Sequence, residues 1–387
     1  MGWQSLALVG LLTFVLTLGL AALIDVTNDG PSCGDCIWYR QMGDAPWMLQ
    51  PAPWGYRIAV PFVGWVLTRV LAADIRQVFG GLTYVGFALV NTTLLLWAWR
   101  GLRLRLGYAA AATSFYAFSY AVATYLETPI HIGLYEHLAV LLGFMAIYHR
   151  RFYALVGVLL VGMLVKETVA ILIPVYAVTA LWEERLRALP RVGMLTVVAA
   201  VPFFALRSGV LFADPAGLGT YTSFYTLAYV REVAASYGGY FNAARKIALA
   251  SPVLIPLSVL GFLYAPPRDR LLAIIVPLAW MQILLATDVE RVAAIGFPGT
   301  TLLLASLLRR LNAREVLAWT LLSIANFYLY IHVLLDPRMY DRVRDVNEFL
   351  RFLPIAFVGT YAAILVWFLW GVRRRLTQPP ALERPGG

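Results

Sequence analysis

Carboxylates and cations recur at the ends of apolar segments in this chain, and together these side chains could transfer a group from a phosphate-bearing donor. Such a transfer needs a carboxylate that accepts the proton of the attacking hydroxyl. It also needs cations that offset the charge developing on the departing phosphate, for which lysine and arginine are suited. The catalytic candidates are Asp35 and Glu127, and the substrate-binding candidates are Tyr56, Arg57, His131, Glu136, Lys166, Glu167, Asp288 and Arg291.

Three of these candidates, Asp35, Tyr56 and Arg57, lie in one polar and aromatic stretch, CGDCIWYRQMGDAPWMLQPAPWGYRIAVP, at residues 33–61. Its C-x-x-C pair, Cys33 and Cys36, has no second pair elsewhere, which favours a local disulfide or two free thiols over a metal site. Its aromatic residues suit sugar faces or the water interface of a membrane, and the interface is the default for Trp38, Tyr39, Trp47, Trp54 and Tyr56.

The remaining candidates follow in later turns of the chain. Glu127 and His131 are four residues apart, which would place them on one face of a helix. Each charged residue also has a simpler explanation. Glu136 could be satisfied by the neighbouring His137 inside a helix bundle, and the consecutive Lys166 and Glu167 could form a local ion pair.

The composition indicates a polytopic membrane protein. The chain is 61% hydrophobic and 13% charged, with a mean hydropathy of +0.73, values outside the range of soluble domains. Its net charge of +10 comes with basic residues clustered in short links between apolar segments. Such clustering is a topology signal, so nucleic acid is not an expected partner.

About twelve apolar segments are long enough to be considered membrane-crossing helices. They run near 4–24, 78–99, 107–126, 130–148, 152–165, 168–182, 192–211, 247–265, 271–287, 293–308, 315–335 and 353–372. The first is expected to be a retained helix and not a cleaved signal peptide. The segments at 152–165 and 168–182 are short enough to form one broken unit, and 58–72 suits a juxtamembrane helix in the first outer loop.

The positions of the basic residues predict the orientation of these helices. Alternate links carry arginine clusters, and such links stay in the cytoplasm. These clusters are Arg100, Arg103 and Arg105; Arg150 and Arg151; Arg185, Arg187 and Arg191; Arg268 and Arg270; Arg309, Arg310 and Arg314; and Arg373, Arg374 and Arg375. Both termini are then cytoplasmic, and the candidate site residues lie on the outer side.

Several other kinds of enzyme are not indicated by the sequence. It lacks a phosphate-binding G-x-x-x-x-G-K loop, a G-x-S-x-G nucleophile elbow and an H-E-x-x-H zinc motif. A membrane enzyme without these motifs can still transfer a group from a lipid that carries a phosphate leaving group.

The chain resembles the GT-C class of integral membrane glycosyltransferases, and in particular bacterial polytopic members that form cell-surface glycopolymers. In these, an aspartate shortly before an aromatic pair is followed by a proline-rich run and an arginine, which Asp35, Trp38-Tyr39 and PAPWGYRIAVP match here. The later LVKET and DVERVAAIGFP stretches resemble two outer-turn signatures of the class.

This resemblance implies an all-α, GT-C-like bundle at 1–375, with loops 25–77 and 212–246 contributing the site and a disordered cytoplasmic tail at 376–387. It implies sugar transfer from a polyprenyl-phosphate donor to a glycan, lipid or protein acceptor outside the bacterial plasma membrane. Asp35 would be the base and Glu127 would assist it. The GDC sequence at Asp35 departs from the D-x-D or D-E pair of the class and leaves the need for a divalent metal open.

Two other functions are compatible with the same residues. A transporter or flippase of a lipid-linked or anionic substrate would explain the broken 152–182 unit, although no internal symmetry supports it. An O-antigen ligase or polymerase would share the donor. Those enzymes rely on arginines in a large late outer loop, where residues 212–246 offer Arg231, Arg245 and Lys246.

Overall fold

The structure is a computed structural model of the 387-residue chain. It describes residues 34–45, 57–119, 132–207, 253–282, 293–334 and 359–367, with scattered positions in 10–19 and at 122 and 125. Side chains are described from residue 39 in the first range, and up to residues 205 and 328 in the third and fifth.

Every regular element in these ranges is a helix, which confirms the expected all-α class. The α-helices are α2 (Gly34–Asp44), α3 (Ala59–Leu71), α4 (Ile75–Leu96), α5 (Leu106–Ala117), α7 (Gly133–Tyr148), α8 (Phe152–Val165), α9 (Leu172–Glu184), α10 (Leu189–Arg207), α14 (Leu254–Tyr264), α15 (Pro267–Leu272), α16 (Ile275–Met281), α18 (Phe297–Leu308) and α19 (Ala313–Leu334). A π-helix, η2 (Trp97–Gly101), extends α4, and two 3-10 helices, η3 (Glu167–Ile171) and η4 (Arg185–Ala188), flank α9.

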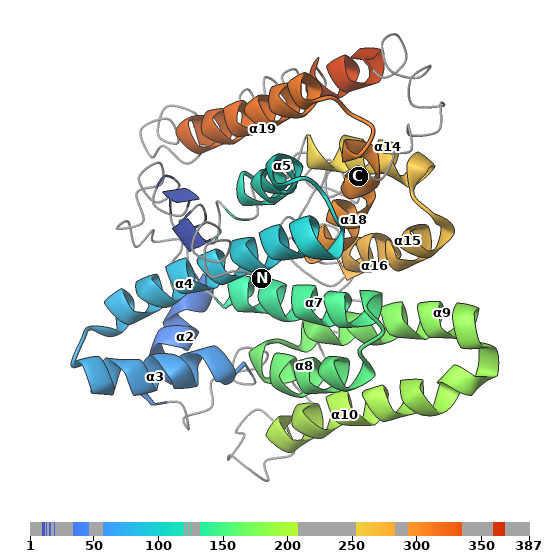
Figure 1. Ribbon diagram of the computed structural model, residues 1–387. Helices are drawn as coiled ribbons and strands as arrows, with labels where there is room; N and C mark the ends of the chain where they lie inside the picture. The colour runs from blue at the N-terminus through green and yellow to red at the C-terminus, as the bar shows by residue number, and fades with distance from the viewer. Residues whose placement is uncertain are drawn as a thin grey trace, which may run out of the picture.

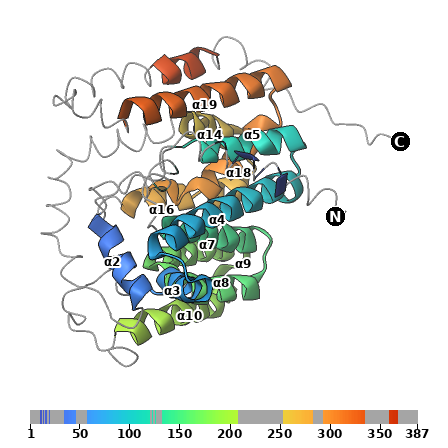
Figure 2. The same ribbon diagram turned by 90° about the vertical axis from the view of Figure 1, so that its left-hand side faces the viewer.

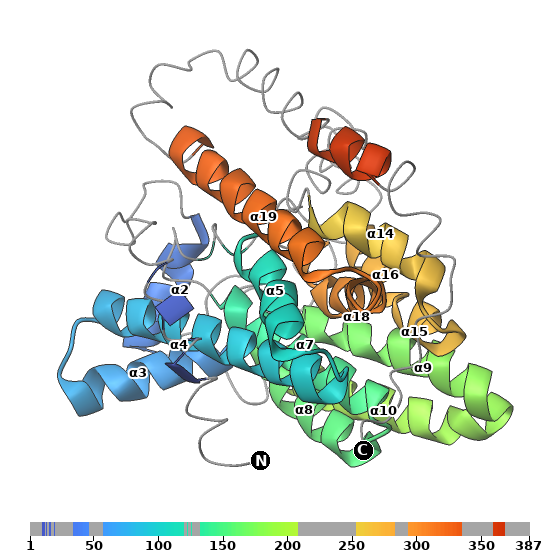
Figure 3. The same cartoon turned by 45° about the horizontal axis from the view of Figure 1, so that its top comes forward.

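The helices form two groups that meet along α4 and α7. Helices α7, α8, α9 and α10 pack side by side in the lower half of Figure 1, while α5, α14, α16, α18 and α19 lie above them. Helix α19 crosses over α5, as Figure 3 shows. Helices α2 and α3 pack against the start of α4 at one end of the molecule (Figure 2).

The two ends of the α7–α8 hairpin carry different charged residues. Helix α7 runs to Tyr148, the chain turns at Arg150 and Arg151, and α8 returns antiparallel to it. Sixteen helical residues span about 24 Å at 1.5 Å each. Glu136 and Lys166 therefore lie at one end of the hairpin, and the arginine turn lies at the other.

The close packing of α14 on α18 depends on a glycine. A Cβ atom on Gly261 would stand 2.1 Å from the carbonyl oxygen of Leu303, so only glycine lets the two backbones approach this closely. Ser258 extends the contact by donating a hydrogen bond of 3.0 Å to the Thr300 carbonyl. Small residues commonly permit such helix contacts.

One expected helix is divided in the structure. The segment predicted at 271–287 contains the end of α15, a turn at 273–274 and then α16. Pro277 is the third residue of α16 and has no N–H to bond to the preceding turn. A proline is best tolerated near the start of a helix, which agrees with a helix that restarts here.

Two stretches, Ile75–Gly101 and Glu167–Ala205, are long and apolar enough to cross a membrane by length and composition. The second contains the turn at Arg185, whose positive φ of 56° follows the end of α9. The count of twelve crossings and the orientation of the termini stay predictions. The expected juxtamembrane segment at 58–72 is helical, as α3.

Candidate functional site

Six side chains from four separate parts of the chain meet at the end of the hairpin where α7 begins and α8 ends. We call them the Lys166 cluster; they are Tyr39, Arg57, Glu136, Lys166, Glu167 and Thr168. The cluster joins helix α2 and the segment before α3 to the first turn of α7 and to the junction between α8 and α9.

Glu136 accepts two hydrogen bonds in the first half of the cluster. The Lys166 ammonium lies 2.7 Å from its Oε2 atom, and the Thr168 hydroxyl donates to its Oε1 atom. The Glu136 side chain has no exposed surface. A carboxylate buried to this degree must be paired and hydrogen-bonded, and these two partners meet that need.

Arg57 and Glu167 form the second half. The Nη2 atom of Arg57 donates to Oε1 of Glu167 at 2.8 Å, and its Nε atom donates to Oε2 at 3.3 Å. Its Nη1 atom donates to the Tyr39 hydroxyl at 2.9 Å. This two-point contact uses the planar fork of the guanidinium, which lysine could not reproduce.

The chain geometry at Lys166 explains why two consecutive residues have different partners. Helix α8 ends at Val165, and Lys166 is extended with φ −164° and ψ 140° before η3 begins. Side chains that follow each other in extended backbone point to opposite sides. Lys166 therefore reaches α7, while Glu167 reaches Arg57.

A close approach holds this junction together. A Cβ atom on Gly162 would lie 2.7 Å from a methyl carbon of Val169, and the Lys166 amide donates to the Gly162 carbonyl at 2.8 Å. The glycine lets the chain fold back on the last turn of α8, so the cluster is built on a fixed backbone.

The two cations and two carboxylates of the cluster balance in charge. Burial lowers the pKa of the Arg57 guanidinium, but the charge of Glu167 and hydrogen bonds from Arg57 to Glu167 and Tyr39 outweigh this, and the pKa is raised well above its ordinary value. Arg57 is therefore charged at every physiological pH.

An aromatic layer supports Glu136 from behind. The neighbouring His137 is fully buried, and its Nδ1 atom lies 2.7 Å from the Tyr116 hydroxyl. Phe297, from the end of the AIGFP stretch, packs against Tyr116 with ring centroids 4.3 Å apart and against His137 at 5.5 Å. This layer connects α5 and α18 to the first turn of α7.

Two of the simpler explanations drawn from the sequence are wrong. Glu136 does not pair with His137, because adjacent residues on a helix point in different directions: Glu136 meets Lys166, and His137 meets Tyr116. Lys166 and Glu167 do not hydrogen-bond to each other either, since each has its hydrogen-bonded partner elsewhere.

The structure thus joins four of the predicted residues, Arg57, Glu136, Lys166 and Glu167. Asp35 lies within α2, one helical turn before Tyr39, and only its backbone is described. The other predicted residues lie outside the described residues; they are Tyr56, Glu127, His131, Asp288 and Arg291.

Two members of the cluster were not predicted as site residues. Tyr39 was expected at a membrane interface, but it is fully buried and bonded to Arg57. Thr168 belongs to the LVKET stretch, yet its spacing does not show that it shares a carboxylate with Lys166. Thr168 lies two residues after Lys166, where the helix is interrupted, so helical periodicity does not predict its partner.

Within the described ranges, no three histidine, cysteine, aspartate or glutamate side chains gather where they could hold a metal ion. Asp25, Asp29 and Asp288 lie outside those ranges. Comparison of the chain with protein-family models, curated proteins and solved structures finds no match in any of the three.

Proposed function

We propose that the protein is an integral membrane glycosyltransferase of the GT-C type, which transfers a sugar from a polyprenyl-phosphate donor to an acceptor on the outer side of the membrane. Asp35 would take the proton of the acceptor hydroxyl as its oxygen forms a bond to the anomeric carbon. The bond from that carbon to the phosphate oxygen breaks, and the polyprenyl phosphate leaves with the bonding electrons.

One observation carries this proposal: α2, the helix that contains position 35, is hydrogen-bonded to Arg57 of the Lys166 cluster. Tyr39 bonds to Arg57, and position 35 precedes Tyr39 by one turn of α2. Four residues of an α-helix rise by about 6 Å. A base at position 35 and a phosphate at Arg57 would then be neighbours.

Both cations have donors left for a phosphate. A guanidinium has five N–H donors, and Arg57 uses three in the bonds to Glu167 and Tyr39. An ammonium has three, and Lys166 uses one on Glu136. The exposed fractions of these side chains are 11% for Arg57 and 15% for Lys166, so a small part of each remains accessible.

The test is sugar transfer by the purified protein with a panel of polyprenyl-phosphate sugars. Asp35→Asn should abolish transfer because the amide cannot accept the proton, while donor binding and thermal stability remain. The matched control is Asp44→Asn, which changes an exposed aspartate of the same helix and should retain activity. Full activity in Asp35→Asn would reject the assignment of the base.

The metal requirement has its own experiment. Transfer is measured after treatment with a chelator and again after addition of Mg²⁺ or Mn²⁺. Activity that disappears and returns with the metal would show that transfer requires a divalent metal. Activity that survives chelation would leave the cations of the Lys166 cluster to stabilise the leaving phosphate.

A transporter of anionic or lipid-linked substrates is the second candidate, and the interruption of the helix at Lys166 favours it. Transporters place substrate sites at broken helices, and here a charged junction separates α8 from α9. Liposomes containing the protein distinguish the two. Movement of a solute or lipid-linked sugar across the bilayer, with no transfer to any acceptor, would support the transporter.

A further inference from the structure

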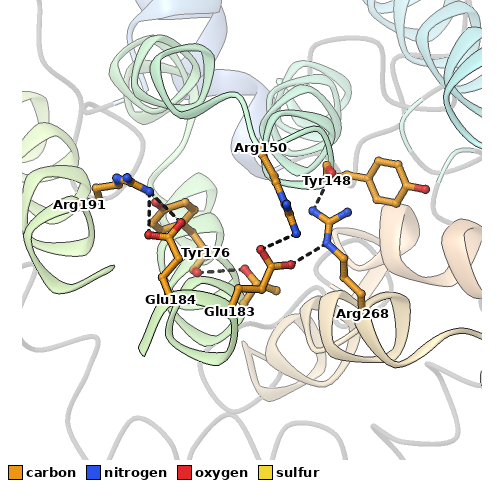
Figure 4. Close-up of polar contacts among 8 residues, drawn as sticks. Tyr148, Arg150, Tyr176, Glu183, Glu184, Arg191 and Arg268 are labelled. Atoms are coloured by element: carbon orange, nitrogen blue, oxygen red, sulfur yellow. Dashed lines mark hydrogen bonds and ion pairs between the residues drawn. The ribbon is translucent and has the colours of Figure 1, made fainter. Parts of the chain in front are cut away.

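A second charged cluster lies at the opposite end of the α7–α8 hairpin, around a hollow of about 70 Å³. We call it the Arg268 cluster, which consists of Arg150, Arg151, Glu183, Glu184, Arg191 and Arg268. Figure 4 shows how side chains from the α7–α8 turn, α9, α10 and α15 converge there. We propose that this hollow binds the phosphate of an anionic phospholipid headgroup.

The balance of charge favours an anion. Four arginines face two glutamates, which leaves two positive charges in excess. Glu183 is shared between Arg150 at 3.0 Å and Arg268 at 2.9 Å. Within the described part of the chain, the Arg151 side chain makes no hydrogen bond or ion pair. An additional acceptor would satisfy guanidinium donors that the glutamates do not.

A phosphate could also replace the glutamates in the ion pairs of the Arg268 cluster. Exposed fractions are 68% for Arg150, 50% for Arg191 and 36% for Arg268. Ion pairs this exposed are weak, so a phosphate can share or replace a glutamate. Arginine gives phosphate a two-point contact, which lysine does not.

The size of the hollow limits the ligand. A single water needs roughly 10–15 Å³, so a volume of about 70 Å³ accepts a group as large as a phosphate. Pockets that enclose a whole small molecule measure about 300–1,000 Å³. The rest of the ligand must therefore lie outside the hollow, as the glycerol and acyl chains of a lipid would.

Large exposed side chains lie close to the lining residues along the chain and favour a lipid source. Tyr153, Trp182 and Leu186 lie within two residues of lining residues along the chain, and 83%, 73% and 75% of their surfaces are exposed. Tyrosine and tryptophan are typical of the headgroup level of a membrane. Basic pockets between helices at this level bind anionic headgroups.

The backbone of the arginine turn shows that arginine lies there at a conformational cost. Arg150 has a φ of 58°, in the left-handed region where glycine or asparagine would be less strained. Arg103 and Arg185, in two other basic links, have φ values of 55° and 56°. The conformation of the turn does not favour arginine at such positions. Its charge gives a reason for it to be there.

The inference rests on membrane localisation, which the proposed function shares, but not on sugar transfer. Full-length protein is purified in micelles that contain equal amounts of phosphatidylglycerol and phosphatidylcholine, and the retained lipid is identified by native mass spectrometry. We expect preferential retention of phosphatidylglycerol. Arg151→Gln should weaken it by about fivefold, the effect of one arginine beside an anionic headgroup. Arg151→Gln/Arg268→Gln should remove the preference.

Arg314→Gln is the matched control, because it removes an exposed arginine of another basic link, in the first turn of α19. Equal retention by wild type and Arg151→Gln would overturn the proposal, as would an equal loss in Arg314→Gln. Competition by inorganic phosphate alone at the same strength as the lipid would overturn the lipid source. Because transfer activity is measured separately, an inactive protein that retains the lipid would reject only the proposed function.

Discussion

The Lys166 and Arg268 clusters occupy opposite ends of the same hairpin and use charge in opposite ways. In the Lys166 cluster each cation has a carboxylate partner, and the four charged side chains are at most 15% exposed. In the Arg268 cluster, one carboxylate serves two arginines, and the paired side chains are between 25% and 68% exposed.

This difference decides what each cluster can do. Buried ions must be paired because their removal from water is costly. The pairs of the Lys166 cluster therefore hold α2, α7 and the α8–α9 junction in one arrangement. Exposed ions lose little when they separate. The second cluster can therefore exchange partners with a ligand at little cost to the fold.

The largest expected effect comes from breaking the buried pair. Glu167→Gln leaves the Arg57 guanidinium without its carboxylate, and such a change costs about 3–5 kcal/mol of the free energy of unfolding. Thermal unfolding of the purified protein should show a large decrease in Tm. The matched control is Glu184→Gln in the other cluster, for which we expect less than about 1 kcal/mol. Similar losses in the two variants would contradict the distinction between the clusters.

Replacing both partners should recover most of that loss. Arg57→Met/Glu167→Met removes the buried charges and keeps apolar volume, a change that is commonly neutral or stabilising. Comparison with each single variant gives the coupling energy of the pair. If the double variant is stable but inactive in sugar transfer, Arg57 and Glu167 act in the site itself. If it is stable and active, they only hold the fold.

The sequence predicts much of this arrangement, though not the pairing. Apolar runs bounded by arginines predict the helices, and charges at helix ends select Arg57, Glu136, Lys166 and Glu167 as candidates. The partner of each cannot be predicted, because Arg57 and Glu167 are 110 residues apart. Only the packing of α3 on α8 brings them together.

The Arg268 cluster shows more clearly what the sequence cannot predict. Its arginines are visible in the sequence as a topology signal, and that explanation accounts for every one of them. The acidic members, Glu183 and Glu184, and the hollow itself depend on how α7, α8, α9, α10 and α15 meet. Sequence periodicity within one helix carries no information about such a junction.

A smaller effect should come from Arg150→Gly, which tests whether arginine in the left-handed region serves the fold. Relief of the left-handed conformation contributes about 1–2 kcal/mol, while glycine's entropy and the loss of the exposed pair with Glu183 offset it by similar amounts. We expect the free energy of unfolding to stay within about 1 kcal/mol of wild type, with weaker retention of phosphatidylglycerol. A strongly destabilised variant would assign Arg150 a structural role instead.

The smallest effect concerns His149, beside the arginine turn. Partial burial lowers its pKa, and the charges of Arg151 and Arg268 lower it further. The folded chain then binds fewer protons than the unfolded chain, so this residue's contribution to stability is present above the ordinary histidine pKa and is lost as the pH falls through the lowered value. Arg151→Gln should move the pKa of His149 upward, as should bound phosphatidylglycerol, whereas Arg314→Gln should leave it unchanged. NMR titration of the imidazole measures these shifts. An unchanged His149 pKa in Arg151→Gln would mean that the Arg151 charge does not act on the imidazole, and burial with Arg268 would then account for the lowered pKa.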